Sequence, residues 1–161
     1  MPILSSLKAW TLAASLAFAH HAEPKNPVPR PMSEGLAEAI ASEAIANPLF
    51  AGVDGPQQTA ALLVVFGFRE SSYRSSAVGD GGRSCGVFQT PCKETPLGDV
   101  NRQARIAIRI MKRSIEAIPE HPLALYCGGS LERGSSLGDL RLIAAHELIS
   151  EVPLIEGEDE Q

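Results

Sequence analysis

Glu70 is the residue of this sequence best placed to act as an acid or a base. Residues 55–65 before it predict a helix, with Pro56 near the first helical position, where a missing N–H costs least. Glu70 follows Phe66 and Leu63 by four and seven residues, so it shares the helix face that carries these apolar side chains. Burial raises the pKa of a carboxyl group, as a general acid requires. The position therefore predicts a proton donor, although a helix-terminal glutamate that bends toward water has the same spacing.

A glycine-rich segment follows this helix. Residues 79–82 read Gly-Asp-Gly-Gly, and the glycines tolerate the positive φ that a tight surface loop requires. Asp80 supplies a second carboxylate here, but an ordinary turn contains the same residue. Residues 86–89, Gly-Val-Phe-Gln, then place a polar amide beside two apolar side chains. The acid, the loop and the amide form the stretch that the rest of the chain must position.

These motifs resemble the lysozyme-like domain of lytic transglycosylases and goose-type lysozymes. Members typically carry Glu-Ser, an Ala-Val segment and Gly-Leu-Met-Gln or Gly-Leu-Phe-Gln, where this chain has Glu-Ser-Ser-Tyr, Ala-Val-Gly and Gly-Val-Phe-Gln. Residues 124–129, Ala-Leu-Tyr-Cys-Gly-Gly, resemble the family's Ala-Tyr-Asn-Ala-Gly motif. Leu125 stands where the family usually has an aromatic ring, and Cys127 stands where it has Asn. The resemblance implies a mostly α, lysozyme-like single domain with an active-site cleft.

The resemblance also implies a reaction, the cleavage of the β-1,4 bond between N-acetylmuramic acid and N-acetylglucosamine in peptidoglycan. Glu70 would protonate the leaving oxygen while the N-acetyl group of the muramic acid assists. Glu70 would then act as a base on the sugar's own 6-hydroxyl, which gives a 1,6-anhydro end without water. This route needs one carboxylate and no cofactor.

Two other functions fit the same residues. A muramidase would use Asp80 as the partner carboxylate that positions a water, and the reaction would be a hydrolysis. A non-catalytic module of a cell-envelope machine would grip peptidoglycan without cutting it, and the retained Glu70 argues against this alternative. The single-acid route is favoured over hydrolysis, because Asp80 is also what an ordinary turn contains.

The motifs assign further side chains to substrate contact. By resemblance, Ser71 and Gln89 would orient the acid or contact sugar. Tyr126 would hydrogen-bond near Glu70, and the backbone or ring of Phe88 would line the cleft. Each has a structural alternative: Ser71 as a helix-end cap, Gln89 as a loop amide and Tyr126 as a half-buried core residue. Their joint occurrence favours the site.

Three cysteines, Cys85, Cys92 and Cys127, lie within or beside the motifs. Three pairings are possible, and an odd count leaves one thiol unpaired in an exported protein. If the resemblance holds, the segments around Gly86 and Tyr126 meet at the cleft. A bond from Cys85 or Cys92 to Cys127 would then tie its two sides, whereas a bond between Cys85 and Cys92 would close a small loop.

Other kinds of site are disfavoured by the sequence. Cysteine catalysis would need a nearby histidine as base, and neither His121 nor His146 is recognisably placed for this role. No paired Cys-x-x-Cys or His-x-x-x-His spacing indicates a metal site. The net charge of −5 is concentrated at the C-terminal end, and the basic residues between Arg69 and Arg141 are spread out, unlike a nucleic-acid footprint. We therefore expect glycan strands as the partner, with no metal and no nucleic acid.

The ends of the chain are expected to lie outside the folded unit. In residues 1–22, Lys8 precedes an apolar run that ends in Ala17-Phe18-Ala19, a small-x-small cleavage site typical of an export signal. The run is well short of the roughly 20 residues that span a bilayer, so we expect no membrane span and a periplasmic or extracellular location. An amphipathic helix of a cytosolic protein is the alternative. Residues 23–32 are rich in proline and predict a stiff linker, and residues 151–161 predict a loose acidic tail.

The domain itself is expected to span residues 33–150 of the 161, a length that suits one core with 44% apolar residues. Ser33 predicts a helix N-cap, and Pro48 a stop. Leu140 and Ile143 are expected to face the core from the last helix. Five helices and no convincing strand pair predict a mostly α protein. The predicted helices cover residues 34–46, 55–70, 99–118, 121–126 and 137–149.

Overall fold

The structure, a computed structural model, describes residues 2–25 and 30–154. Within these ranges it is mostly helical, as predicted, and it adds a small antiparallel sheet of strand order β1-β2-β3 that the sequence did not indicate. Strands of two residues are too short to leave an alternating pattern. The helices are α1 (Pro2–Ala22), α2 (Glu34–Ala46), α3 (Gly55–Ser71), α4 (Val100–Ala117), α5 (Ala124–Gly128) and α6 (Leu131–Glu151). The strands are β1 (Val78–Gly79), β2 (Ser84–Cys85) and β3 (Thr90–Pro91).

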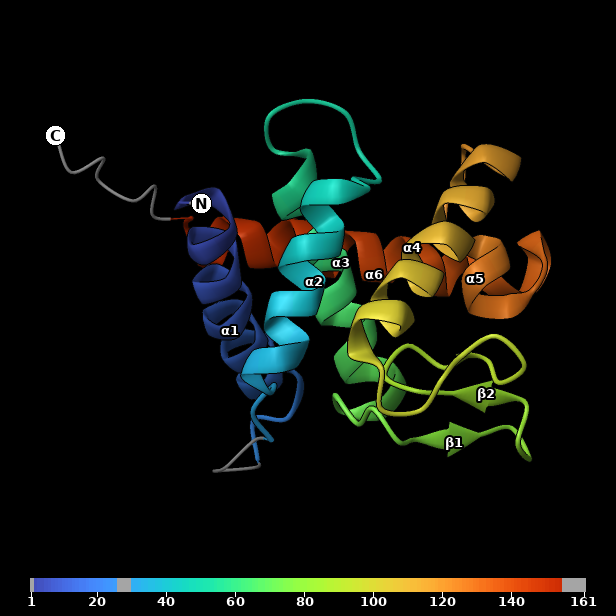
Figure 1. The fold of residues 1–161 in the computed structure, drawn as a ribbon. Coiled ribbons are helices and arrows are strands. Elements are labelled where there is room, and N and C mark those ends of the chain that lie inside the picture. Colours follow the sequence, from blue (N-terminus) through green and yellow to red (C-terminus); the bar gives the residue numbers. More distant parts are fainter. Residues whose placement is uncertain (1, 26–29, 155–161) are drawn as a thin grey trace, which may run out of the picture.

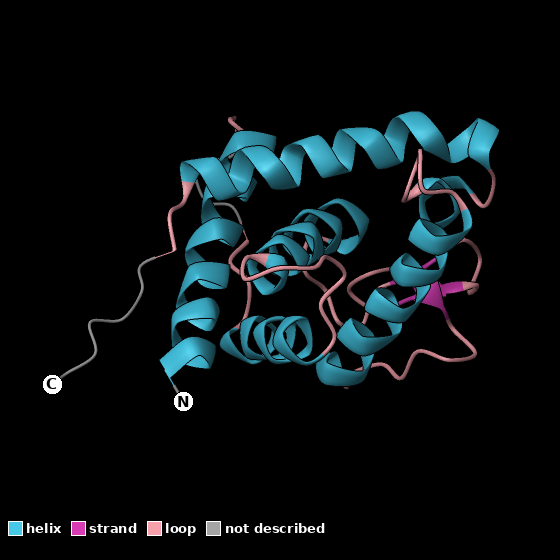
Figure 2. Ribbon diagram, turned by 90° about the horizontal axis from the view of Figure 1, so that it is seen from above, coloured by secondary structure: helices cyan, strands magenta, loops and turns pink. Residues whose placement is uncertain are grey.

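The helix that carries Glu70, α3, is the centre of the core. Every residue from 59 to 68 is buried, because the helix is apolar on all sides. Helices α1, α2 and α6 contact it, and Figures 1 and 2 show it enclosed by its neighbours. The helix ends at Ser72, a left-handed residue whose N–H donates to the carbonyl of Phe68. Glu70 therefore lies where the buried helix meets the loops.

The N-terminal segment packs into this core, although the folded unit is expected from the sequence to start at Ser33. Helix α1 buries Leu7, Trp10 and Phe18, each no more than 6% exposed. The Phe18 ring lies edge-on to Phe68, with 5.7 Å between centroids, and Trp10 Nε1 donates to the carbonyl of Val152 at 2.5 Å. The apolar run that predicts an export signal also forms one face of a packed helix. Export itself stays a prediction.

Helix α6 faces the core with a different side from the one expected. Leu140 and Ile143 are 61% and 54% exposed. A Cβ added to Gly134 would lie 1.8 Å from the carbonyl oxygen of Ala124, so small residues let α5 pack closely against this helix. The need for that close approach, rather than apolar character, decides which side turns inward. The inward side consists of Gly134, Gly138, Arg141, Ala145 and Leu148.

Two predicted segments extend beyond the described residues. Residues 26–29 of the proline-rich linker and residues 155–161 of the acidic tail lie outside them. Glu151, expected to open the tail, is the last residue of α6. None of the helices in the described ranges combines the length and the hydropathy that crossing a membrane requires.

Candidate functional site

Glu70 lies in the last turn of α3, with its side chain 26% exposed. Its Oε1 atom forms an ion pair with Nη2 of Arg141 at 2.8 Å. Burial raises the pKa of Glu70; the charge of Arg141 opposes this shift, and the charge of Asp80 adds to it. The net direction is upward because desolvation is the largest of the three effects. Glu70 therefore keeps its proton to a higher pH than a glutamate in water.

Arg141 is the residue of this site that the sequence did not reveal. It reaches the acid from α6, is 9% exposed, and stacks on Phe66 with 4.7 Å from its guanidinium carbon to the ring centroid. Its Nε and Nη1 atoms are buried with no hydrogen-bond partner among the described residues. An opposite charge stabilises a buried cation of this kind, so the ionised form of Glu70 stabilises Arg141. The sequence feature that could have indicated Arg141 is its spacing from Gly134 and Gly138, which places all three residues on one face of α6.

Tyr126, from α5, lies beside this pair. Its ring meets Phe66 edge-on, with 4.9 Å between centroids, on the ring that Arg141 also contacts. Its hydroxyl donates to the carbonyl of Phe88 at 2.8 Å rather than to Glu70. Burial, and next the charge of Glu70, raise the pKa of Tyr126 well above its usual value. The phenol therefore remains a neutral hydrogen-bond donor.

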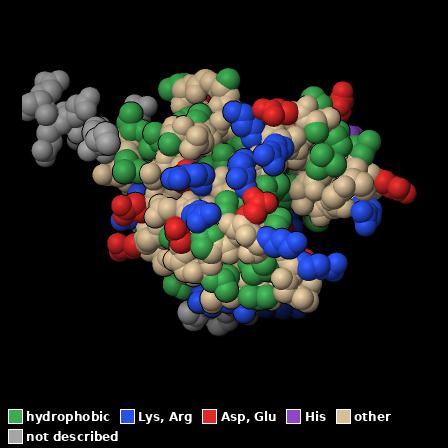
Figure 3. Space-filling model, turned by 45° about the vertical axis from the view of Figure 1, so that its right-hand side comes forward, with side chains coloured by type: hydrophobic (Ala, Val, Ile, Leu, Met, Phe, Trp, Pro, Cys, Tyr) green, Lys and Arg blue, Asp and Glu red, His purple; other side chains and the backbone are tan. Residues whose placement is uncertain are grey.

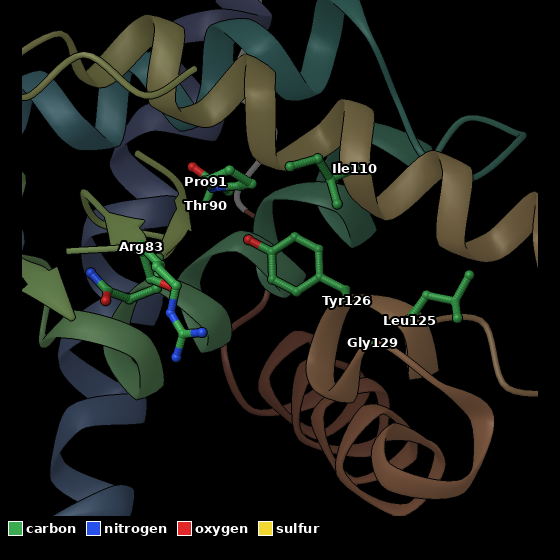
Figure 4. A pocket seen from close by; sticks show the side chains of 9 residues that line it. Arg83, Thr90, Pro91, Ile110, Leu125, Tyr126 and Gly129 are labelled. Carbon is green, nitrogen blue, oxygen red and sulfur yellow. The ribbon is translucent and has the colours of Figure 1, made fainter. Parts of the chain in front are cut away.

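A pocket of about 290 Å³ opens beside Tyr126, and we call it the Tyr126 pocket. Figure 4 shows Arg83 and Ile110 on opposite sides of the Tyr126 ring. Glu70 is not among the residues that line this pocket, so the acid does not lie on the pocket wall. The lining residues are Arg83, Ser84, Gln89, Thr90, Pro91, Ile110, Leu125, Tyr126 and Gly129.

Ser71 and Phe88, two predicted substrate contacts, face the interior instead. Ser71 is 4% exposed, and its hydroxyl donates to the carbonyl of Val87 at 2.8 Å while accepting the N–H of Arg74. Phe88 is 1% exposed, so its ring does not line a cleft. The alternative that its backbone lines the cleft stays a prediction, and its carbonyl accepts the hydroxyl of Tyr126. Ser71 ties the end of α3 to the loop, and Phe88 anchors that loop in the core.

Gln89 is brought to the Tyr126 pocket. Its backbone has a φ of 48°, and its Nε2 atom donates to the carbonyl of Gly86 at 2.9 Å. A Cβ added to Gly79 of β1 would lie 2.3 Å from Oε1 of Gln89, so a side chain there would displace this amide. The loop holds Gln89 in a fixed position on the pocket wall.

Gln103, a buried glutamine, hydrogen-bonds to the loop that carries Gln89. Gln103 of α4 accepts the N–H of Val87 with Oε1 at 2.9 Å, and its Nε2 donates to the carbonyls of Ser75 and Pro96. The Gln103 side chain is fully buried, and its bond to the N–H of Val87 is made away from water. Gly86 has a φ of 77°, and a Cβ there would meet Oε1 of Gln103 at 2.6 Å. The backbone around the candidate site is therefore preorganised.

Asp80 is exposed on the turn between β1 and β2. Its φ of 51° is left-handed, and its Oδ2 accepts the hydroxyl of Ser84 at 2.5 Å. Asp80 therefore has the contacts of an ordinary turn residue. Its charge nevertheless acts on Glu70, where it raises the pKa of the acid. The two carboxylates are electrostatic neighbours.

The disulfide joins Cys85 to Cys92, with 4.8 Å between their Cα atoms, and closes the small loop between β2 and the segment after β3. Cys127 is a free, half-buried thiol, so the pairing across the cleft that the resemblance implied is wrong. Burial raises the pKa of Cys127 to about 11, which keeps its thiol protonated at neutral pH. In the described part of the chain, no three His, Cys, Asp or Glu side chains lie close enough to hold a metal ion.

Reduction of the Cys85–Cys92 disulfide is expected to lower the free energy of unfolding by about 2 kcal/mol, because the bond restricts a short loop of the unfolded chain. The measurement is urea unfolding with and without dithiothreitol, followed by circular dichroism. Cys127→Ser is the control, since it leaves the disulfide intact and should show the same loss on reduction. An unfolding midpoint that does not move on reduction would contradict the prediction.

The candidate site thus consists of Glu70 at the end of a buried helix, its ion-pair partner Arg141, the neutral Tyr126 and a loop closed by a disulfide. Comparisons of this chain with protein-family models, curated proteins and solved structures find no match.

Proposed function

We propose that this protein cleaves the glycan strands of peptidoglycan as a lytic transglycosylase of lysozyme-like fold, with Glu70 as its only catalytic carboxyl group. The proposal depends chiefly on one observation: burial at the end of α3 raises the pKa of Glu70, yet the side chain stays partly exposed. A general acid needs both its proton and access to the substrate. The resemblance of the motifs around Glu70, Gln89 and Tyr126 supplies the substrate class.

The proposed reaction uses one carboxyl group twice, first as a proton donor and then as a proton acceptor. Protonated Glu70 gives its proton to the glycosidic oxygen, the bond from that oxygen to the anomeric carbon breaks, and the N-acetyl group of the muramic acid stabilises the positive carbon. The Glu70 carboxylate then removes the proton of the 6-hydroxyl as that oxygen bonds to the anomeric carbon. Arg141, at 2.8 Å, stabilises the carboxylate between the two steps. No water is consumed.

The mass of the released fragments tests this reaction directly. Muropeptides released from purified cell walls should carry a 1,6-anhydro end, which is lighter by one water than a reducing end. Fragments with reducing ends would instead indicate a muramidase. That second candidate is favoured by one observation, the charge of Asp80 acting on Glu70, since a hydrolase needs a partner carboxylate.

A non-catalytic peptidoglycan-binding module of a cell-envelope machine remains the third candidate. It is favoured by the ion pair between Glu70 and Arg141, which a purely structural role would also explain.

Nucleic acid is not the proposed partner. Figure 3 shows Lys and Arg side chains on the face over α4 with acidic side chains among them, and Arg105 and Arg109 form ion pairs with Glu43 and Glu94.

Export forms part of the same proposal. Its substrate lies outside the cytoplasm, and the Cys85–Cys92 disulfide supports an oxidising compartment. Secretion of the protein by its natural host, followed by sequencing of the mature N-terminus, tests this part.

Replacing Arg141 by Met is expected to raise the pKa of Glu70 further, because the charge of Arg141 lowers it in the native protein. Activity requires protonated Glu70 in the first step, so it falls as the pH rises through this pKa. The basic limb of the pH–activity profile should therefore move to higher pH in the variant. Carbon-13 NMR titration of the Glu70 carboxyl measures the same shift without substrate.

Arg113→Met is the matched control for this experiment, since Arg113 is exposed on α4 and forms no ion pair with a described residue. It should leave the Glu70 titration unchanged. A Glu70 pKa that stays in place or falls in Arg141→Met would contradict the assigned role of the arginine.

A further inference from the structure

Helix α6 carries an apolar ridge that the fold leaves uncovered. Leu137, Leu140 and Ile143 are 42%, 61% and 54% exposed, and their spacing of three residues places them along one side of the helix. Figure 2 shows α6 running along the outer edge of the helix bundle. Isolated exposed leucines are normal, but a contiguous row of large apolar side chains indicates a contact with another molecule.

The residues of this ridge are arranged symmetrically about Leu140. Leu137 and Ile143 lie three residues before and after it, and Arg133 and Glu147 lie seven residues before and after it. Seven residues are close to two helical turns, so all five share one side of the helix. Arg133 and Glu147 are exposed, and neither forms an ion pair with a described residue of its own chain.

We propose that two copies of this chain associate through α6, with the helices antiparallel and a two-fold axis at Leu140. Each Leu140 would then meet its counterpart, and Leu137 would pack on Ile143 of the second copy. Arg133 would face Glu147 of the second copy, twice in the symmetric contact. A parallel arrangement would instead place arginine against arginine and glutamate against glutamate, at a cost. The charge pattern therefore favours a second copy of this chain as the partner, with its α6 antiparallel.

This contact is independent of the proposed catalysis. Arg141, the next residue after Leu140, turns inward to Glu70, while Leu140 turns outward. Helix α6 thus has an inner side that belongs to the candidate site and an outer ridge that is free for a second copy. Variants of the ridge test association without removing a group of the site.

Sedimentation velocity of the full chain over a range of concentrations tests the dimer. The wild type should show a monomer–dimer equilibrium, and Leu140→Glu should raise its dissociation constant at least about tenfold, because two carboxylates would meet at the axis. Leu97→Glu is the control, since Leu97 is 49% exposed in the loop before α4 and lies outside the ridge. A wild type that stays monomeric, or a dimer that Leu140→Glu leaves unchanged, overturns the proposal.

A charge swap tests the direction of the helices. Arg133→Glu alone and Glu147→Arg alone should each weaken the dimer, and the double variant should restore it, because each charged pair is then merely reversed. Failure of the double variant to recover overturns the antiparallel arrangement. Leu140→Cys tests the contact without introducing a charge. Mild oxidation should join two copies by a disulfide between their Cys side chains at this position. Absence of this disulfide counts against a two-fold axis at Leu140.

Discussion

Glu70→Gln is expected to slow the cleavage of peptidoglycan by about 10² to 10⁴-fold, the contribution typical of a general acid. The amide cannot donate a proton to the glycosidic oxygen or accept one from the 6-hydroxyl, so both steps of the proposed reaction lose their catalyst. Glutamine keeps the size of the side chain and an oxygen that can face Arg141. Clearing of a turbid suspension of purified cell walls measures the loss.

The control for this variant is Glu116→Gln, which changes an exposed carboxyl group on α4 that lies outside the motifs. It should clear the walls at the wild-type rate. Equal clearing by wild type and Glu70→Gln would end the proposal that Glu70 is catalytic. No clearing by either protein would favour the binding module. Thermal unfolding of both variants checks that the fold is intact, since Glu70→Gln leaves the buried cation of Arg141 without a full charge beside it.

Features set by neighbouring residues could be predicted from the sequence. Ser33 caps α2 as expected, with its side chain accepting the N–H of Leu36 at 3.2 Å, and Asn47 caps the other end before Pro48. The acid at the end of an apolar helix was also predicted, and the structure places Glu70 there with a raised pKa. Capping, helical periodicity and the effect of proline act within a few residues, so one sequence contains the needed information.

Features set by packing across the chain could not be predicted. Arg141 reaches Glu70 from 71 positions away in the numbering, and only the close packing of α5 on Gly134 decides that this side of α6 faces inward. An arginine on a helix usually faces water, so its sequence context predicts exposure. The Cys85–Cys92 bond depends on the pairing of β2 with β3, and strands of two residues leave no alternating pattern in the sequence. The candidate acid was thus predictable and its charged partner was not.

Deletion of residues 1–22 is expected to prevent stable folding. Helix α1 buries Leu7, Trp10 and Phe18 against the core, and truncation of one such aromatic side chain to alanine typically costs about 3 to 5 kcal/mol. A domain is stable by only about 5 to 15 kcal/mol, so loss of the whole helix exceeds what the remaining contacts supply. Circular dichroism of the shortened chain should show no cooperative thermal transition.

Trp10→Ala is the graded form of the same experiment. It should lower the free energy of unfolding by about 3 to 5 kcal/mol, through the lost packing and the lost hydrogen bond to Val152. Leu16→Ala is the matched control, since Leu16 is 43% exposed on the same helix and should cost far less. Both values come from urea unfolding of the full-length chain.

The result bears on the export hypothesis, because α1 and a removed signal occupy the same residues. If cleavage after Ala19 yields the mature protein, the chain that remains must fold without Leu7, Trp10 and Phe18. A shortened chain as stable as the full one would show that α1 is dispensable and would support the export signal. A shortened chain that fails to fold would mean that the helix is retained in the working protein, and export would then need a signal that is not removed.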